Sequence, residues 1–198
     1  MAYGSIKVNN LVYDTGSGDT TVAVSGISTG TADKVAEGNT ELETVDTGSD
    51  GHIKLTTEGS ERLRVIADGK VGIGMTAPTS TLHITGTARV SQAAVADAAA
   101  VGDASTITLD LSTSTNFTVT TDSSTQRTLG NPTGETVGQS GTIVVIGSGF
   151  SGFGSQWIWP GGTAYTATNA TNKIDVLHYY VYAADKILLS SNTNYDVS

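Results

Sequence analysis

The sequence contains no cysteine, and positive charge is scarce. Without thiols the chain has no disulfide framework, no thiolate zinc site and no cysteine nucleophile. Ten lysine and arginine residues stand against 19 aspartate and glutamate residues, for a formal charge of −9. An acidic surface repels phosphate, so we expect no nucleic-acid partner. No apolar run approaches the roughly 20 residues that span a bilayer, so we expect no membrane insertion either.

Small and uncharged residues dominate what is present. Glycine accounts for 24 of the 198 residues, and charged residues for only 15%. That charged fraction is well below the roughly 25% of an average soluble domain. The hydrophobic fraction of 37% is low for one thick core but higher than disorder would predict. The chain therefore has the length and composition of one ordinary domain or two small ones.

Apolar residues recur two positions apart. The pairs are Ile6/Val8, Val22/Val24, Ile53/Leu55, Leu63/Val65, Val71/Ile73 and Leu82/Ile84. This period places both side chains of a pair on one face of an extended strand. Asp68-Gly69, between residues 63–66 and 70–73, is typical of a two-residue hairpin turn. The pattern predicts an all-β fold.

The distribution of aromatic residues divides the chain into regions. Both tryptophans, all three phenylalanines and five of the seven tyrosines lie within 104–198, so the aromatic core is expected there. We predict a short strand-rich segment over 1–30 and a run of short strands over 31–90. An alanine-rich linker or short helix should cover 91–103, since alanine favours helix. A β-sandwich or jelly-roll-like head should follow over 104–198.

The region 31–90 has little apolar surface for its length. A fully buried Val or Leu contributes about 1.5–3 kcal/mol, whereas ordering costs about 1–2 kcal/mol per residue. Three copies wound about a shared axis would bury both apolar groups of every strand, so we expect an intertwined β-stalk in a homotrimer. The candidate trimer core consists of Ile53, Leu55, Leu63, Val65, Val71, Ile73, Leu82 and Ile84.

Asp-Thr-Gly-Ser occurs twice, at 14–17 and 46–49. An aspartic protease needs two such loops facing each other, so that two carboxylates share one proton. The two copies are too close in sequence for a two-lobed enzyme, and the glycines after Ile146 cannot open the helix that a dimeric enzyme requires. We interpret both copies as turns and expect no enzyme, with a protease that uses Asp14 as a remote alternative.

Residues 147–152 match the glycine pattern of dinucleotide-binding loops. That chemistry requires a following helix whose N-terminus faces the pyrophosphate. Residues 153–162 have no helical period and end in Pro-Gly-Gly, so we interpret the glycines as a tight loop and expect no cofactor. His52, His83 and His178 have no partners at ligand spacing, so we expect no metal site.

Aromatic rings concentrate near the C-terminus. The candidate contacts for a receptor or partner are Trp157, Trp159, Tyr165, Tyr180 and Tyr182. Exposed rings of this kind stack on sugars and are favoured at interfaces. The alternative is that most of them build the core of this region.

Residues 59–74 read Gly-Ser-Glu-Arg-Leu-Arg-Val-Ile-Ala-Asp-Gly-Lys-Val-Gly-Ile-Gly, and Thr-Ala-Pro and Leu-His-Ile follow at 76–78 and 82–84. This element resembles one found in tail-fibre-like virion proteins of bacteriophages, especially marine cyanobacterial ones. The stretches 109–111, 131–133, 138–141 and 159–164 are similar to a terminal domain of the same proteins. Met75, where the family usually has Thr, is a minor departure, and the single copy of the stalk element is a larger one.

The resemblance implies an elongated homotrimer in the virion, assembled in the bacterial cytoplasm. We expect other tail or capsid proteins as partners, and a head that contacts either the host surface, with a surface glycan as the ligand, or a neighbouring protein. The N-terminal residues Tyr3, Ile6, Val8 and Leu11 are the candidate docking residues. The main alternative is a capsid decoration, cement or head-fibre protein that stabilises the shell.

Overall fold

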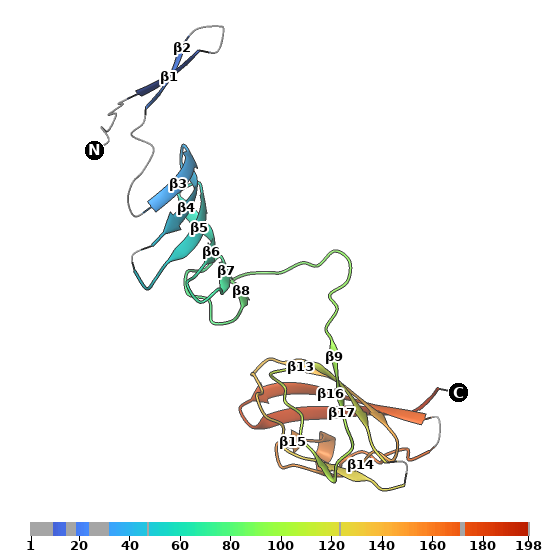
Figure 1. The fold of residues 1–198 in the computed structure, drawn as a ribbon. Coiled ribbons are helices and arrows are strands. Elements are labelled where there is room, and N and C mark those ends of the chain that lie inside the picture. Colours follow the sequence, from blue (N-terminus) through green and yellow to red (C-terminus); the bar gives the residue numbers. More distant parts are fainter. Residues whose placement is uncertain are drawn as a thin grey trace, which may run out of the picture. The chain divides into compact units, whose positions relative to one another are not determined.

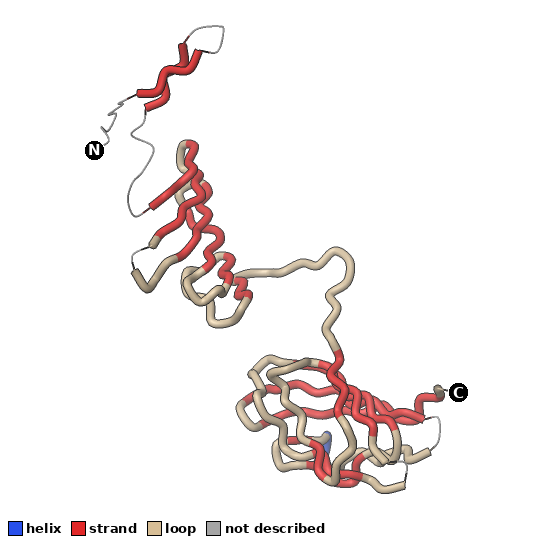
Figure 2. The backbone as a smooth tube through the Cα atoms, in the orientation of Figure 1, coloured by secondary structure: helices blue, strands red, loops and turns tan. Residues whose placement is uncertain are grey.

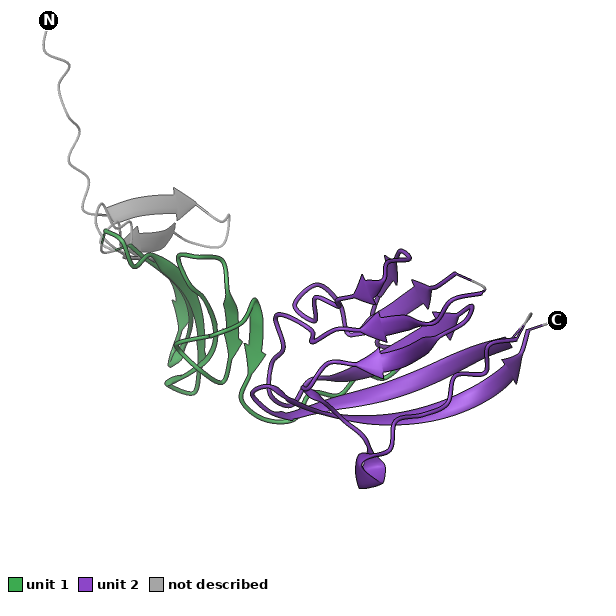
Figure 3. Ribbon diagram, turned by 90° about the horizontal axis from the view of Figure 1, so that it is seen from below, with its two compact units in different colours: residues 1–91 green, residues 92–198 purple. Residues whose placement is uncertain are grey.

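The computed structural model describes residues 10–14, 19–23, 32–46, 48–122, 124–170 and 173–197 (Figure 1). The predicted all-β character is confirmed. Within these residues the only helical element is the short 3-10 turn η2, Pro160–Gly162. The chain divides into two compact units, Met1–Ser91 and Gln92–Ser198 (Figure 3).

Unit 1 contains a two-stranded hairpin and a six-stranded sheet. The hairpin joins β1 (Asn10–Asp14) to β2 (Asp19–Ala23) in antiparallel register. The sheet holds β3 (Ala32–Glu37), β4 (Thr40–Val45), β5 (His52–Thr57), β6 (Ser60–Val65), β7 (Val71–Ile73) and β8 (Leu82–Ile84), in chain order. Neighbouring strands are antiparallel except β7 and β8, which are parallel.

The predicted hairpin around Asp68-Gly69 is confirmed, but its loop is longer than two residues. Ile66 N donates to Lys70 O at 3.0 Å, and Gly69 N donates to Ile66 O at 2.9 Å. Gly69 has a φ of 81°, which glycine adopts without the steric cost of a Cβ atom. A three-residue loop that ends in a left-handed glycine is a common hairpin connection.

Unit 2 is built from two sheets, and the strands from β9 to β14 alternate between them along the chain. Its strands are β9 (Ala98–Val101), β10 (Thr106–Ile107), β11 (Asn116–Thr120), β12 (Arg127–Leu129), β13 (Ser140–Ile146), β14 (Phe150–Phe153), β15 (Trp157–Ile158), β16 (Lys173–Ala183) and β17 (Lys186–Asp196). The larger sheet has the order β15-β17-β16-β13-β11-β9 and the smaller one β10-β12-β14. Since β9, β11 and β13 are parallel, as are β10, β12 and β14, three successive coils of chain stack on one another.

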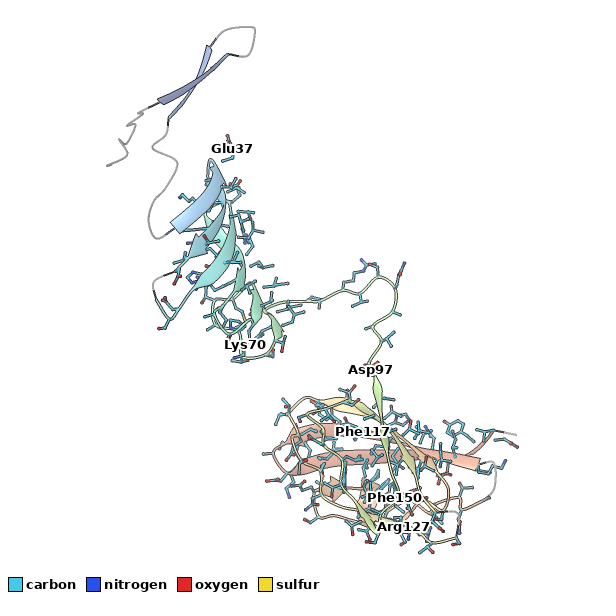
Figure 4. The ribbon with its side chains drawn as sticks, viewed as in Figure 1. Glu37, Lys70, Asp97, Phe117, Arg127 and Phe150 are labelled. Atoms are coloured by element: carbon cyan, nitrogen blue, oxygen red, sulfur yellow. The ribbon has the colours of Figure 1, made fainter. Side chains whose placement is uncertain are left out.

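Both sheets of unit 2 contribute to one hydrophobic core. The core residues are Ile107, Leu109, Leu111, Phe117, Val119, Leu129, Ile143, Val145, Phe150, Trp157, Trp159, Leu177, Tyr179, Val181, Ile187 and Leu189. Phe117 comes from the larger sheet and Phe150 from the smaller one (Figure 4). The two layers agree with the coarse expectation for this region, but the parallel coils differ from the antiparallel order of a jelly roll.

The alternative of a short helix within 91–103 is wrong. Residues 98–101 form strand β9, where Ala99 lies opposite Phe117 of β11. Ala99 and Val101 pack against the core, so strand pairing and burial override the helix propensity of alanine. The residues from 85 to 97 contain neither helix nor strand (Figure 2).

Candidate functional site

The apolar side chains of the six-stranded sheet form two rows that cross its strands. In the first row each residue lies directly opposite the next: Val35, Leu42, Leu55, Leu63, Ile73 and Ile84. In the second row the order is Ile53, Val65, Val71 and Leu82. Residues directly opposite each other point to the same side of a sheet, and side chains two positions apart in a strand share a face. We call this set of ten residues the apolar face.

All eight residues of the predicted trimer core belong to the apolar face. Val35 and Leu42 extend it, and the sequence reasoning missed them. Neither has an apolar residue two positions away, because Asp33 and Glu37 flank Val35 at that spacing and Thr40 and Thr44 flank Leu42, so neither forms an apolar pair. The signal that could have found Leu42 is its alternation with charged residues, which is typical of a strand with two unlike faces.

The apolar face is open to solvent within the described chain. The exposed fractions of its most accessible members are 78% for Val35, 55% for Leu82, 49% for Leu42, 44% for Ile53, 38% for Ile73 and 37% for Leu55. The other four are half-buried. With strands about 4.8 Å apart, the first row extends for roughly 24 Å. A continuous aliphatic surface of this kind marks an interaction site.

Charged side chains line the opposite face of the same sheet, whereas Glu37, two positions from Val35 in β3, lies on the apolar side. Lys34 pairs with Glu41 at 3.0 Å, and Lys54 pairs with Glu43 at 2.8 Å. Arg64 donates to both carboxylate oxygens of Glu61, at 2.7 and 2.6 Å. His83 also lies on this face, opposite Gly72, as expected for a residue between Leu82 and Ile84. Three ion pairs therefore link charged side chains of neighbouring or nearby positions on this face.

These ion pairs shift the acid–base behaviour of the carboxylates. The hydrogen bond from Lys54 lowers the pKa of Glu43 below its ordinary value of 4.5. The two hydrogen bonds from Arg64 lower the pKa of Glu61 in the same way. Both carboxylates are therefore more acidic in the folded sheet than in an unfolded chain.

Most of the aromatic contact candidates lie in the core of unit 2. Trp157 and Trp159 are 5% and 8% exposed, so neither offers a free ring face, and the contact prediction for them is corrected. Trp157 Nε1 donates to Gly130 O at 2.7 Å, and Trp159 stacks on Tyr165 with a centroid separation of 5.5 Å. Tyr165 is half-buried against the core, and burial raises the pKa of its hydroxyl. The structure thus follows the alternative that these rings build the core.

Only two of the five aromatic candidates are largely exposed. Tyr180 and Tyr182 of β16 are 46% and 47% exposed. They alternate with the buried Tyr179 and Val181, so the sheet sends them to its outer face. These two remain candidates for a contact surface.

The candidate docking residues Tyr3, Ile6 and Val8 lie outside the described residues. The backbone of Leu11 lies in β1, opposite Val22. Asp14 ends the same strand, and the rest of its Asp-Thr-Gly-Ser motif also lies outside the described residues. The structure therefore describes these segments only as the backbone of the β1–β2 hairpin.

The second Asp-Thr-Gly-Ser motif forms a local turn. Gly48 N donates to Asp46 Oδ1 at 3.1 Å, the hydrogen bond by which aspartate stabilises turns. The interpretation of this copy as turn chemistry is confirmed.

Within the glycine-rich segment, residues 150–152 belong to β14, and residues 147–149 form the predicted tight loop. It connects β13 to β14, with φ values of 105° at Gly147 and 73° at Gly149. Ser148 Oγ donates to the carbonyl oxygens of Asp122 and Thr125, at 2.6 and 2.5 Å. The loop thus binds the preceding coil of the same chain.

The sequence matches no protein-family model, and no curated protein is significantly similar to it. In the described parts of the chain, no helix has the length and apolar character to cross a membrane. Nor do three or more histidine, aspartate or glutamate side chains of these parts gather as metal ligands would. The apolar face of unit 1 and the exposed residues Tyr180 and Tyr182 of unit 2 are the candidate contact surfaces of the described chain.

Proposed function

We propose that the protein is a fibre-type structural protein of a bacteriophage particle that acts by binding and assembles as a homotrimer through the apolar face. The observation that carries this proposal is that ten aliphatic residues in two continuous rows remain accessible in the single chain. In the trimer each copy covers the apolar faces of the other two. The charged face, with its ion pairs, then lies toward solvent.

The energetics favour a second copy of this chain as the covering partner. Burying the exposed half of an aliphatic side chain contributes about 1 kcal/mol, so ten such residues per copy contribute on the order of 10 kcal/mol. None of the ten residues of the apolar face is charged, although the chain carries a net charge of −9, and a carboxylate on the same side of the sheet, Glu37, lies at the end of the edge strand β3. Copies can therefore approach through this surface with little electrostatic repulsion between facing side chains.

The assignment to a phage fibre is supported by where the family-like residues lie. The element 59–84, which resembles the stalk element of tail-fibre-like proteins, contains strands β6, β7 and β8. It supplies Leu63, Val65, Val71, Ile73, Leu82 and Ile84 of the apolar face. Unit 2, which encloses its own core, would be the head that contacts the host surface or a neighbouring protein.

The mass of the assembly in solution tests the proposal. Light scattering after size exclusion should give three times the chain mass of 20.2 kDa. Leu55→Lys should lower the mass to that of one chain, because the trimer would bury an unpaired ammonium group. Val95→Lys is the matched control, since Val95 is 86% exposed and lies outside every strand.

The control variant should keep the full mass. A wild-type chain that is monomeric or dimeric at all concentrations would overturn the trimer. The phage assignment has its own test, in which antibodies against the chain should label the tail of purified phage particles in electron micrographs. Label confined to the capsid would contradict the tail location.

A further inference from the structure

The outer face of the larger sheet in unit 2 is a second accessible surface, distinct from the apolar face of unit 1. Along β16 the buried residues Leu177, Tyr179 and Val181 alternate with exposed ones. Tyr180 lies directly opposite Leu188 of β17, and His178 lies directly opposite Ser190. An apolar pair and a polar pair are thus neighbours on the outer face.

These two pairs surround a shallow hollow of about 200 Å³. It is lined by His178, Tyr179, Tyr180, Leu188, Leu189 and Ser190. Tyr180 and Leu188 are 46% and 44% exposed, so the tyrosine ring and the leucine side chain are available to a ligand. Pockets for drug-sized ligands measure about 300–1,000 Å³, so this hollow accommodates a single small ring.

The polar side of the hollow offers hydrogen-bonding groups without charge. None of the six lining residues is Asp, Glu, Lys or Arg. The imidazole of His178 has two long contacts of 3.4 Å, from Nδ1 to Thr142 Oγ1 and from Nε2 to Asn192 Nδ2. Contacts of this length are weak, so a ligand hydroxyl can replace them. The Ser190 hydroxyl can both donate and accept a hydrogen bond.

This chemistry excludes several classes of ligand. A phosphate group would find neither a lysine nor an arginine in the hollow, and a purely apolar ligand would cover His178 and Ser190 without satisfying them. An added peptide strand pairs along a sheet edge, whereas this hollow lies on the outer face of the sheet, over the paired strands β16 and β17. What fits is a neutral ring with one C–H face and hydroxyl groups at its edge.

We propose that this hollow binds one pyranose ring of a neutral glycan. The electron-rich face of the Tyr180 ring attracts the C–H bonds on one face of the sugar. The hydroxyl groups at the sugar's edge then exchange hydrogen bonds with His178 and Ser190. This inference deepens the proposed function by naming the ligand class of the head, and three identical heads would add their weak contacts through multivalency.

Saturation-transfer difference NMR on the full chain tests the site directly. The probes are the methyl glycosides of glucose, galactose and mannose, each in the pyranose form. We expect saturation transfer to the ring protons of at least one probe. Tyr180→Ala should weaken its binding at least tenfold, whereas Tyr180→Phe should retain it because the ring remains. No transfer to any of the three probes would overturn the proposal.

Tyr195→Ala is the matched control. Tyr195 is also 46% exposed and lies on the same outer face, opposite Ile174 and away from the hollow. The Tyr195→Ala variant should bind the probe as the wild type does. An equal loss of probe binding in both alanine variants would overturn the site. Light scattering of the same samples separates the two proposals, because sugar binding by a monomeric chain would refute the trimer and leave the glycan site standing.

Discussion

Leu55 lies directly opposite Leu63 in the six-stranded sheet of unit 1, and both side chains are on the apolar face. Lys54, which precedes Leu55, and Arg64, which follows Leu63, are also directly opposite each other, and they lie on the charged face. Adjacent residues of one strand thus lie on opposite faces of the sheet, one face with accessible aliphatic side chains and the other with paired charges. This relationship determines how association and stability should respond to salt and pH.

Salt should leave the association intact. Raising sodium chloride from about 0.1 M to about 1 M shortens the Debye length from about 10 Å to about 3 Å and screens exposed ion pairs. Because the apolar face holds no charge, we expect the mass measured by light scattering to be the same at both concentrations. A mass that falls as salt rises would show that the charged face carries the association instead.

Acid should destabilise the six-stranded sheet. The hydrogen bonds from Lys54 and Arg64 hold the pKa values of Glu43 and Glu61 below 4.5 in the folded state. Their contribution to stability is therefore present above about pH 4.5 and is lost as the pH falls through the folded-state values. Circular dichroism during urea unfolding, repeated at falling pH, should show the midpoint decreasing in this range.

The variant Glu43→Gln should reduce that dependence on pH, since the amide does not titrate. Glu37→Gln, at the exposed end of β3, removes the same charge without touching the Lys54–Glu43 pair and is the control for the change in net charge. An identical pH response in Glu43→Gln and the wild type would contradict the assigned role of the Lys54–Glu43 pair.

Gly72 should not tolerate a side chain. A Cβ atom at this position would lie 2.5 Å from the carbonyl oxygen of Met75, which belongs to the turn after β7. Gly72→Ala should therefore destabilise unit 1 by about 1–3 kcal/mol, the usual cost of overpacking. Urea unfolding measures the loss, with Gly51→Ala as the control because the nearest atoms there are 3.7 Å away. Equal midpoints for the two variants would refute the clash.

The stacking of coils in unit 2 leaves less room for a side chain at Gly141 than there is at Gly72. A Cβ atom there would come within 1.6 Å of Thr115 O in the preceding coil. We expect Gly141→Ala to cost about 3 kcal/mol or more, whereas Gly102→Ala, with no atom within 4 Å, should cost little. Both tryptophans are buried in unit 2, so their fluorescence follows its thermal unfolding without a signal from unit 1. A wild-type melting temperature for Gly141→Ala would refute the close stacking.

The strands of unit 1 were predictable because their signal is local. A period of two directs Leu63 and Val65 to one side of any extended strand, whatever their neighbours are. The same reasoning located the turns at Asp46 and Asp68, where short-range hydrogen bonds and a left-handed glycine decide the conformation. The period of two did not identify Val35 and Leu42, because a single apolar residue shows no periodicity.

The aromatic residues of unit 2 were predicted less well because their environment is not local. Trp157 is buried by strands that are distant in sequence, and its indole N–H reaches the carbonyl of Gly130. Likewise, residues 98–101 have a helix-forming composition but become a strand through pairing with β11. Neither outcome can be derived from a short window of sequence.

By itself the sequence determined the all-β class, the turns and the two unlike faces of the unit 1 sheet, since alternation and turn chemistry act over a few residues. The tertiary structure alone decided which surfaces are enclosed. In unit 2 the parallel coils bring segments together across long stretches of chain, so the tryptophans are buried and Tyr180 is exposed. In unit 1 the ten residues of the apolar face belong to one sheet, and six of them are at least 37% exposed, because a sheet buries a face only against a second layer.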